Sequence, residues 1–238
     1  MRMSVRSVPF MSSMRKASVP VDFFPPEYIT ANLVARWAAD PLDSTYADGA
    51  SVTSWSTTHG TPTAFTNGAK TAPAYKRGGA NNHSYVNFST TAMGLLSGTV
   101  TVGSNFSILI VATAETLLGG AQRTLQGNLN WLYGPYSNTW AVYNGSVFSS
   151  PTLAATAGQV VSAMIVRQAV DTFLWMNGLY YGSRAGSGGF GTALGLSGAG
   201  AFNEPWIGRV YEIIVYNIND FILAGQVHAW LNTKYGVV

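Results

Sequence analysis

Short apolar runs separated by Gly, Asn and Ser recur along the chain from residue 27, and no other feature constrains the fold as strongly. Residues 105–113 (NFSILIVAT) and 159–167 (QVVSAMIVR) have the length of strands and are rich in β-branched residues. Runs of this kind, divided by turn residues, are typical of an all-β sandwich or barrel. We therefore expect two antiparallel sheets packed face to face.

Two further segments predict strands near the end of the chain. Residues 172–176 lead into Asn177-Gly178, a strong hairpin signal because both residues tolerate positive φ. Residues 209–216 (RVYEIIVY) predict the closing strand. Strict alternation would place Tyr211, Ile213 and Val215 on one face, and Val210, Glu212, Ile214 and Tyr216 on the other.

One segment, from about residue 220 to 235, has the pattern of an amphipathic helix. Asn219 is the expected N-cap, and Gly236 is expected to end the helix. Ile218 and Leu223 stand at the positions of a hydrophobic staple. The apolar stripe comprises Leu223, Val227, Trp230 and Leu231. Gly225 lowers helix propensity, so we expect it to lie close to a neighbouring backbone.

Composition narrows the class of protein further. Hydrophobic residues make up 47% of the chain and charged residues 10%, which excludes a disordered chain. Cysteine is absent, so disulfides, thiolate metal sites and cysteine nucleophiles are excluded. The apolar runs are well short of the roughly 20 residues that span a bilayer, and we expect no membrane partner.

Residues 1–26 differ from the rest of the chain. They contain four prolines and four basic residues (Arg2, Arg6, Arg15 and Lys16), and no acid occurs before Asp22. They show no strand or helix periodicity, and they lack the apolar region of a secretory signal. We expect an extended arm over residues 1–26 that docks on a partner or, alternatively, folds back on its own domain, followed by one sandwich domain over residues 27–238. The domain is nearly neutral, which argues against a specific nucleic-acid partner.

The order of these segments carries a resemblance to a known family. It is found in residues 105–113, 174–178 (LWMNG), 207–217 (IGRVYEIIVYN) and 227–235 (VHAWLNTKY). These residues resemble the laminin-G-like jelly rolls of the concanavalin A-like superfamily. Residues 33–40 (LVARWAAD) and 52–55 (VTSW) are similar to the start of such domains in bacteriophage virion proteins. The resemblance implies a jelly-roll sandwich with one C-terminal helix.

Glycosidases of this superfamily use a strand bearing Glu-x-Asp-x-x-Glu, and this chain lacks that motif. Retaining hydrolysis needs two carboxyl groups about 5 Å apart. The glutamates Glu27, Glu115, Glu204 and Glu212 form no cluster in the sequence, and Glu212 is expected to hydrogen-bond nearby backbone. The histidines His59, His83 and His228 lack metal-ligand spacing. We expect neither an enzyme nor a cofactor.

Two binding features remain open from the sequence. Asp40, Asp43 and Asp48 gather carboxylates in one loop, which makes them weak calcium candidates, although Asp40-Pro41 and Asp48-Gly49 also favour turns. Aromatic residues between positions 131 and 143 could present flat faces to sugar rings, or fill the core or a protein interface. These residues are Trp131, Tyr133, Tyr136, Trp140 and Tyr143.

The resemblance and the arm together favour a non-enzymatic structural protein of a bacteriophage virion. It would be a capsid decoration or surface component, anchored by its arm to other virion proteins and present in multiple copies or as a homo-oligomer. A carbohydrate-binding, lectin-like module that recognises a cell-surface glycan is the first alternative. A glycan-processing enzyme without the usual motif is the second.

Overall fold

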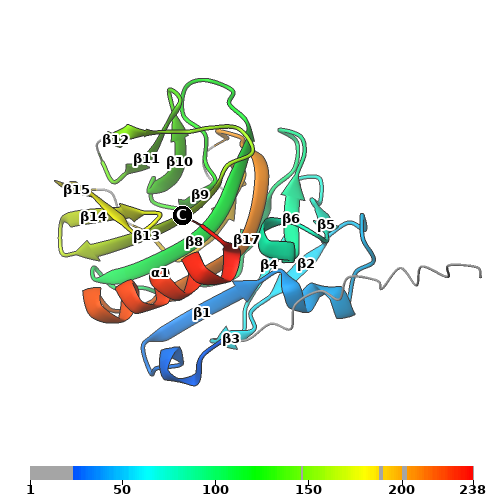
Figure 1. Ribbon diagram of the computed structural model, residues 1–238, viewed down its shortest axis with the longest axis horizontal. Helices are drawn as coiled ribbons and strands as arrows, with labels where there is room; N and C mark the ends of the chain where they lie inside the picture. Colours follow the sequence, from blue (N-terminus) through cyan, green and yellow to red (C-terminus); the bar gives the residue numbers. More distant parts are fainter. Residues whose placement is uncertain (1–23, 146, 188–189, 200–202, 238) are drawn as a thin grey trace, which may run out of the picture.

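The computed structural model describes residues 24–145, 147–187, 190–199 and 203–237 (Figure 1). Within these residues seventeen strands form two antiparallel sheets, one of nine strands and one of eight. One α-helix near the C-terminus completes the described fold, so the predicted class is confirmed. The basic residues of the arm, Arg2, Arg6, Arg15 and Lys16, lie outside the described residues.

Sheet A has the strand order β15-β14-β13-β8-β17-β1-β3, with β6 pairing with β17 and β5 with β6. Its strands are β1 (Leu33–Ala38), β3 (His59–Gly60), β5 (Ala74–Lys76), β6 (Tyr85–Phe88), β8 (Phe106–Thr116), β13 (Val160–Gln168), β14 (Asp171–Met176), β15 (Leu179–Ala185) and β17 (Ile207–Tyr216). The predicted hairpin joins β14 to β15, and both Asn177 and Gly178 have positive φ as expected.

Sheet B has the order β12-β11-β10-β9-β16-β7-β4-β2. Its strands are β2 (Ser54–Ser56), β4 (Ala64–Thr66), β7 (Leu95–Ser97), β9 (Leu125–Gly127), β10 (Leu132–Tyr136), β11 (Thr139–Tyr143), β12 (Val147–Ala154) and β16 (Leu194–Leu196). Three short 3-10 helices, Pro26–Tyr28, Asp40–Ser44 and Ala80–Asn82, lie in connecting segments of the described chain.

Two separate apolar clusters hold the fold together. The larger lies between the sheets and includes five fully buried tryptophans: Trp37, Trp55, Trp131, Trp140 and Trp206. The smaller lies between the outer face of sheet A and the C-terminal helix α1 (Phe221–Tyr235). Because the central strands β1, β8, β13 and β17 have side chains in both clusters, the middle of sheet A is buried on both faces.

A β-bulge in β17 corrects the predicted alternation of that strand. The register against β8 shifts between Val210 and Glu212, so one extra residue is accommodated there. As a result Val210 joins Ile213 in the core between the sheets, while Tyr211 lies on the helix side with Ile214. The bulge therefore places both Tyr211 and Glu212 under α1.

Helix α1 has the predicted extent, but its details differ from the sequence prediction. Asp220, not Asn219, is the N-cap, and its carboxylate accepts hydrogen bonds from the backbone of Ile222 and Leu223. Gly236 ends the helix in the left-handed conformation, as expected. The expectation for Gly225 is wrong, because a Cβ at this position would meet nothing within 4 Å. No helix among the described residues has the length and apolar character needed to cross a bilayer.

The described chain begins with a residue that belongs to the folded body. Phe24 is buried, and its ring lies 5.4 Å from the ring of Trp230 on α1 and 6.0 Å from that of Tyr28. The guanidinium of Arg36 lies 4.6 Å from the centre of the Phe24 ring. The last residues of the predicted arm that the structure describes therefore pack on the folded body.

Candidate functional site

A hollow of about 240 Å³ lies on the outer face of sheet B. Leu132 and Tyr136 of β10 and Ala141 and Tyr143 of β11 line it. Side chains alternate along these strands, and the intervening residues, such as Tyr133, lie in the core between the sheets. The lining residues therefore face away from the core.

Three polar residues from outside these two strands complete the wall of the hollow: Arg123, Asn130 and Glu204. Arg123 Nε donates to Glu204 Oε2 at 2.7 Å, and Arg123 Nη2 donates to Asn130 Oδ1 at 2.9 Å. The Arg123 side chain is only 3% exposed, whereas that of Glu204 is 40% exposed. Arg123 thus holds the two other polar side chains at the rim, within reach of solvent.

Backbone geometry explains how Arg123 reaches this position. The segment that carries it runs close against β10, and a Cβ at residue 134 would collide with the carbonyl of Gln122. Glycine at position 134 therefore permits the approach. The backbone N–H of Arg123 also donates to the carbonyl of Glu204 at 3.0 Å, which fixes two segments far apart in sequence side by side.

The wall offers the hydrogen-bonding groups that a polyhydroxylated ligand needs. Glu204 Oε1 accepts no hydrogen bond from the described residues, and the Asn130 side-chain N–H groups donate none to them. A hydroxyl group both donates and accepts, so these two side chains suit it. Tyr136, which is 37% exposed, adds an aromatic ring at the rim.

The hollow has one carboxylate, Glu204, among the described residues that line it. Glycoside hydrolysis by the common mechanisms needs a pair of carboxyl groups flanking the scissile bond. The arrangement can therefore bind and orient a ligand through Glu204, Arg123 and Asn130, but it lacks the second carboxyl group of such a pair.

The structure corrects most of the predicted glycan-binding residues. Trp131, Tyr133 and Trp140 are completely buried between the sheets, so they offer no face to a sugar. Tyr133 and Trp140 instead stack on each other, with ring centres 5.2 Å apart. Tyr136 and Tyr143 are the two residues of the predicted group that reach the surface, and both line the hollow.

The polar residues of the wall were not predicted from the sequence as binding residues. Arg123 and Glu204 are 81 positions apart, and neither belongs to a recognisable motif. Asn130 has a φ of 57°, which is typical of a turn and gives no indication of binding. Only the pairing of distant strands brings these residues together, so the sequence held no local signal for them.

The predicted calcium ligands do not converge. Asp40 accepts hydrogen bonds from His83 Nδ1 at 2.7 Å and from the backbone of Ser84 at 2.8 Å. Asp43 pairs with Arg77, and Asp48 lies 3.8 Å from Lys76 Nζ. No group of three or more acidic or histidine side chains among the described residues could hold a metal ion, so these three weak calcium candidates do not form a site together.

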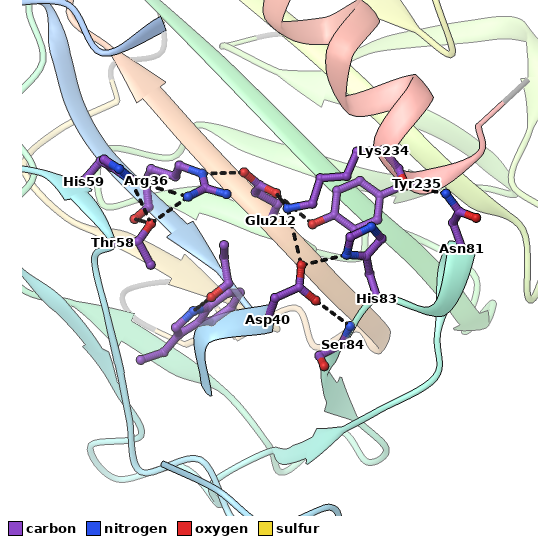
Figure 2. Close-up of polar contacts among 12 residues, drawn as sticks. Arg36, Asp40, Thr58, His59, Asn81, His83, Ser84, Glu212, Lys234 and Tyr235 are labelled. Carbon is purple, nitrogen blue, oxygen red and sulfur yellow. Dashed lines mark hydrogen bonds and ion pairs between the residues drawn. The ribbon is translucent and has the colours of Figure 1, made fainter. Parts of the chain in front are cut away.

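A second polar cluster lies on the other side of the molecule, between sheet A and α1. Figure 2 shows Arg36 of β1, Glu212 of β17 and Lys234 of α1 pointing toward one another. Arg36 Nε lies 2.6 Å from Glu212 Oε1, and Lys234 Nζ lies 2.8 Å from Glu212 Oε2. The Tyr235 hydroxyl donates to the same Oε2 at 2.7 Å, and Lys234 also lies 3.4 Å from Asp40.

This buried network is structural. The side chains of Arg36 and Glu212 have no exposed surface, so no ligand reaches them. Glu212 was expected to hydrogen-bond nearby backbone, but its partners among the described residues are side chains from β1 and α1. The bulge in β17 presents this carboxylate to the helix, and the network fixes α1 on the sheet. Burial and the Glu212 charge raise the pKa of Tyr235, which keeps its hydroxyl protonated as a donor.

The third histidine also has a structural role. His228 Nε2 lies 2.9 Å from the hydroxyl of Ser162, and the Ser162 hydroxyl also contacts Asn232. Ser162 is completely buried, and the contact joins β13 to α1. Burial lowers the pKa of His228 from 6.5 to about 4, which keeps the ring neutral near pH 7.

No family model and no curated protein sequence matches this chain significantly. Solved structures do resemble it. Domain 4 of the extracellular GH43 arabinanase AbnA from Geobacillus stearothermophilus aligns with a TM-score of 0.60 and 14% identity, over 83% of this chain and 98% of that one. Trypanosoma rangeli sialidase aligns with a TM-score of 0.59 and 14% identity, over 84% of this chain and 33% of its own length.

The binding domain of botulinum neurotoxin serotype D aligns with a TM-score of 0.58 and 9% identity, over 84% of this chain and 52% of that one. The chain therefore spans a third of the sialidase and about half of the toxin domain. At such low identities the likeness concerns architecture alone. The chain has the β-sandwich fold that these three proteins contain.

Proposed function

We propose that this protein is a non-catalytic carbohydrate-binding module whose site is the hollow on sheet B. One observation carries the proposal: two outward tyrosines and a buried arginine that holds Glu204 and Asn130 at the rim surround the same small cavity. Sugars are bound by this combination of aromatic faces and planar polar groups, because a pyranose ring has both apolar C–H faces and hydroxyl edges.

The structural neighbours are compatible with this proposal. The arabinanase domain was solved in complex with arabinotriose, and the toxin domain is described as a binding domain. The fold hosts many functions, so these relatives add support only at the level of architecture. The geometry of the hollow is the stronger argument.

The bacteriophage virion role stays a prediction that rests on the sequence resemblance. Residues 1–23 of the arm that would anchor the protein lie outside the described residues, so the structure adds nothing for or against docking. A surface component of a virion and a glycan-binding module are compatible roles. A glycan-processing enzyme is the less favoured alternative, because Glu204 has no second carboxyl group beside it among the lining residues described.

A glycan array probed with the full chain tests the proposal, with two single-site variants as comparison. Tyr136→Ala removes a ring at the rim, and we expect about a tenfold or greater loss of binding, as for an aromatic residue central to an interface. Tyr180→Ala is the matched control, because Tyr180 is also exposed but lies on β15 of the other sheet. Absence of glycan binding by the unmodified chain, or an equal loss in both variants, would overturn the proposal.

A further inference from the structure

We infer that the hollow selects an electrically neutral sugar ring and discriminates against sugars that carry a carboxylate, such as uronic acids. This inference rests on the proposed function and assigns its substrate class. Three features of the hollow support it: its volume, the charge balance of its wall, and the hydrogen-bonding groups that the wall offers.

The volume limits the ligand to a small unit. Pockets for drug-sized ligands have volumes of roughly 300–1,000 Å³. The hollow, at about 240 Å³, is smaller, and its floor is formed by Leu132 and Ala141. One sugar ring with an apolar face fits such a space, while further sugar units would extend past the exposed rim at Tyr136.

The charge of the wall is already balanced. The guanidinium of Arg123 has the carboxylate of Glu204 2.7 Å from its Nε and the side-chain carbonyl oxygen of Asn130 2.9 Å from its Nη2. Both partners are oxygen acceptors at two of the three guanidinium nitrogens, and the Arg123 side chain, which is only 3% exposed, is too deeply buried to meet a ligand carboxylate at the rim. Arg123 therefore acts as a scaffold for the wall and is not presented as an anion receptor.

The groups that remain available favour hydroxyls over carboxylates. Glu204 Oε1 is an acceptor at a side chain that is 40% exposed, and the Asn130 amide supplies donors. A sugar hydroxyl donates to the first and accepts from the second. A sugar carboxylate has no proton to donate at neutral pH, and its charge would lie next to that of Glu204. Juxtaposed like charges at an interface select against the wrong partner.

Matched sugar pairs test this selectivity directly. Glucose and glucuronic acid, and likewise galactose and galacturonic acid, differ only in oxidation at C6, so any difference in affinity reports the carboxylate. We titrate the full chain with each sugar by saturation-transfer NMR at low salt. In the pair whose neutral sugar binds, the acidic sugar should bind at least about tenfold more weakly, a difference in binding free energy of about 1.4 kcal/mol.

The variant Glu204→Gln removes the negative charge and keeps an oxygen acceptor. We expect the ratio of the two affinities, neutral sugar over acidic sugar, to fall by about tenfold or to drop below one. The substitution removes the negative charge of Glu204 that would repel a sugar carboxylate beside Arg123. Thermal melting confirms that the variant is folded. If it is not, the comparison of matched sugars on the unmodified chain still decides the question.

The outcomes separate this inference from the proposed function. If the acidic sugar binds as tightly as the neutral one or more tightly, and if Tyr136→Ala abolishes that binding, the inferred selectivity is wrong, whereas the proposed glycan binding at the hollow still holds. An unchanged preference in folded Glu204→Gln would also overturn it. If the unmodified chain binds neither member of either pair and no glycan on the array, the proposed function fails, and the inference that rests on it fails as well.

Discussion

The buried carboxylate of Glu212 gives the most direct test of how α1 is held on the sheet. Glu212→Gln keeps the shape of the side chain but removes its charge. In the unmodified protein this carboxylate accepts hydrogen bonds from Arg36 Nε at 2.6 Å, from Lys234 Nζ at 2.8 Å and from the Tyr235 hydroxyl at 2.7 Å. Lys234 still has Asp40 at 3.4 Å after the substitution, whereas the fully buried Arg36 loses the negative charge of Glu212.

The expected loss follows from this geometry. Removing one partner of a buried ion pair costs about 3–5 kcal/mol, because the remaining charge stays in a poorly solvated site. The total free energy of unfolding of a domain is roughly 5–15 kcal/mol, so the loss is a large fraction of it. For a chain of this length about 1 kcal/mol shifts the melting temperature by 2–4 °C, and we expect a decrease of about 10 °C.

Urea unfolding followed by tryptophan fluorescence measures the loss, with Arg77→Gln as the control. Arg77 forms an ion pair with Asp43 at the surface, where both side chains are more than a third exposed. Water screens such a pair, so the control should unfold near the midpoint of the unmodified protein. If Glu212→Gln and Arg77→Gln change the midpoint equally, the buried network does not stabilise the fold in the way argued above.

Three further substitutions test other parts of the fold. Gly225→Ala should raise the free energy of unfolding by about 1 kcal/mol, because its Cβ meets open space; a lower urea midpoint would contradict this. The pKa of His228 is about 4 in the folded protein and 6.5 in the unfolded chain, so the unfolded chain takes up the proton first as the pH falls. The stabilisation of the fold that comes from the neutral ring is therefore complete above pH 6.5 and is lost as the pH falls toward 4. This loss in the free energy of unfolding is about 2–3 kcal/mol between pH 7 and 4.5. Urea unfolding of the unmodified protein and of His228→Gln at both pH values measures it, and the variant should not show this loss. Phe24→Ala in the full chain should lower the free energy of unfolding by about 3 kcal/mol, and unchanged thermal melting would show that Phe24 does not stabilise the folded body.

The sequence predicted the class of fold because that information is local. Apolar runs of strand length, the Asn177-Gly178 turn and the amphipathic pattern before Gly236 each act over a few residues. The bulge in β17 was not predictable in this way. It depends on how Val210 and Glu212 pair with β8, which belongs to a distant part of the chain. One extra residue was enough to reverse the face of Val210 and Tyr211.

The candidate site was predictable only in small part. Aromatic residues between 131 and 143 did mark the two strands that form the hollow, but strand alternation buried Trp131, Tyr133 and Trp140 and left Tyr136 and Tyr143 outside. Arg123 and Glu204 have no motif, and their contact exists only after the fold forms. Residue type alone therefore indicated which strands form the hollow, but it could not indicate which aromatic side chains lie on the outer face of sheet B.

The packing of Phe24 against Trp230 has a consequence for how the molecule can be displayed. Phe24 begins the described chain and Trp230 belongs to the C-terminal helix, so both ends of the body lie on the outer side of sheet A. The hollow opens on the outer side of sheet B. A support attached at residue 24 or at the end of α1 would therefore lie on the side opposite the hollow. A surface coated with the folded body in this way would leave the hollow of each molecule turned outward.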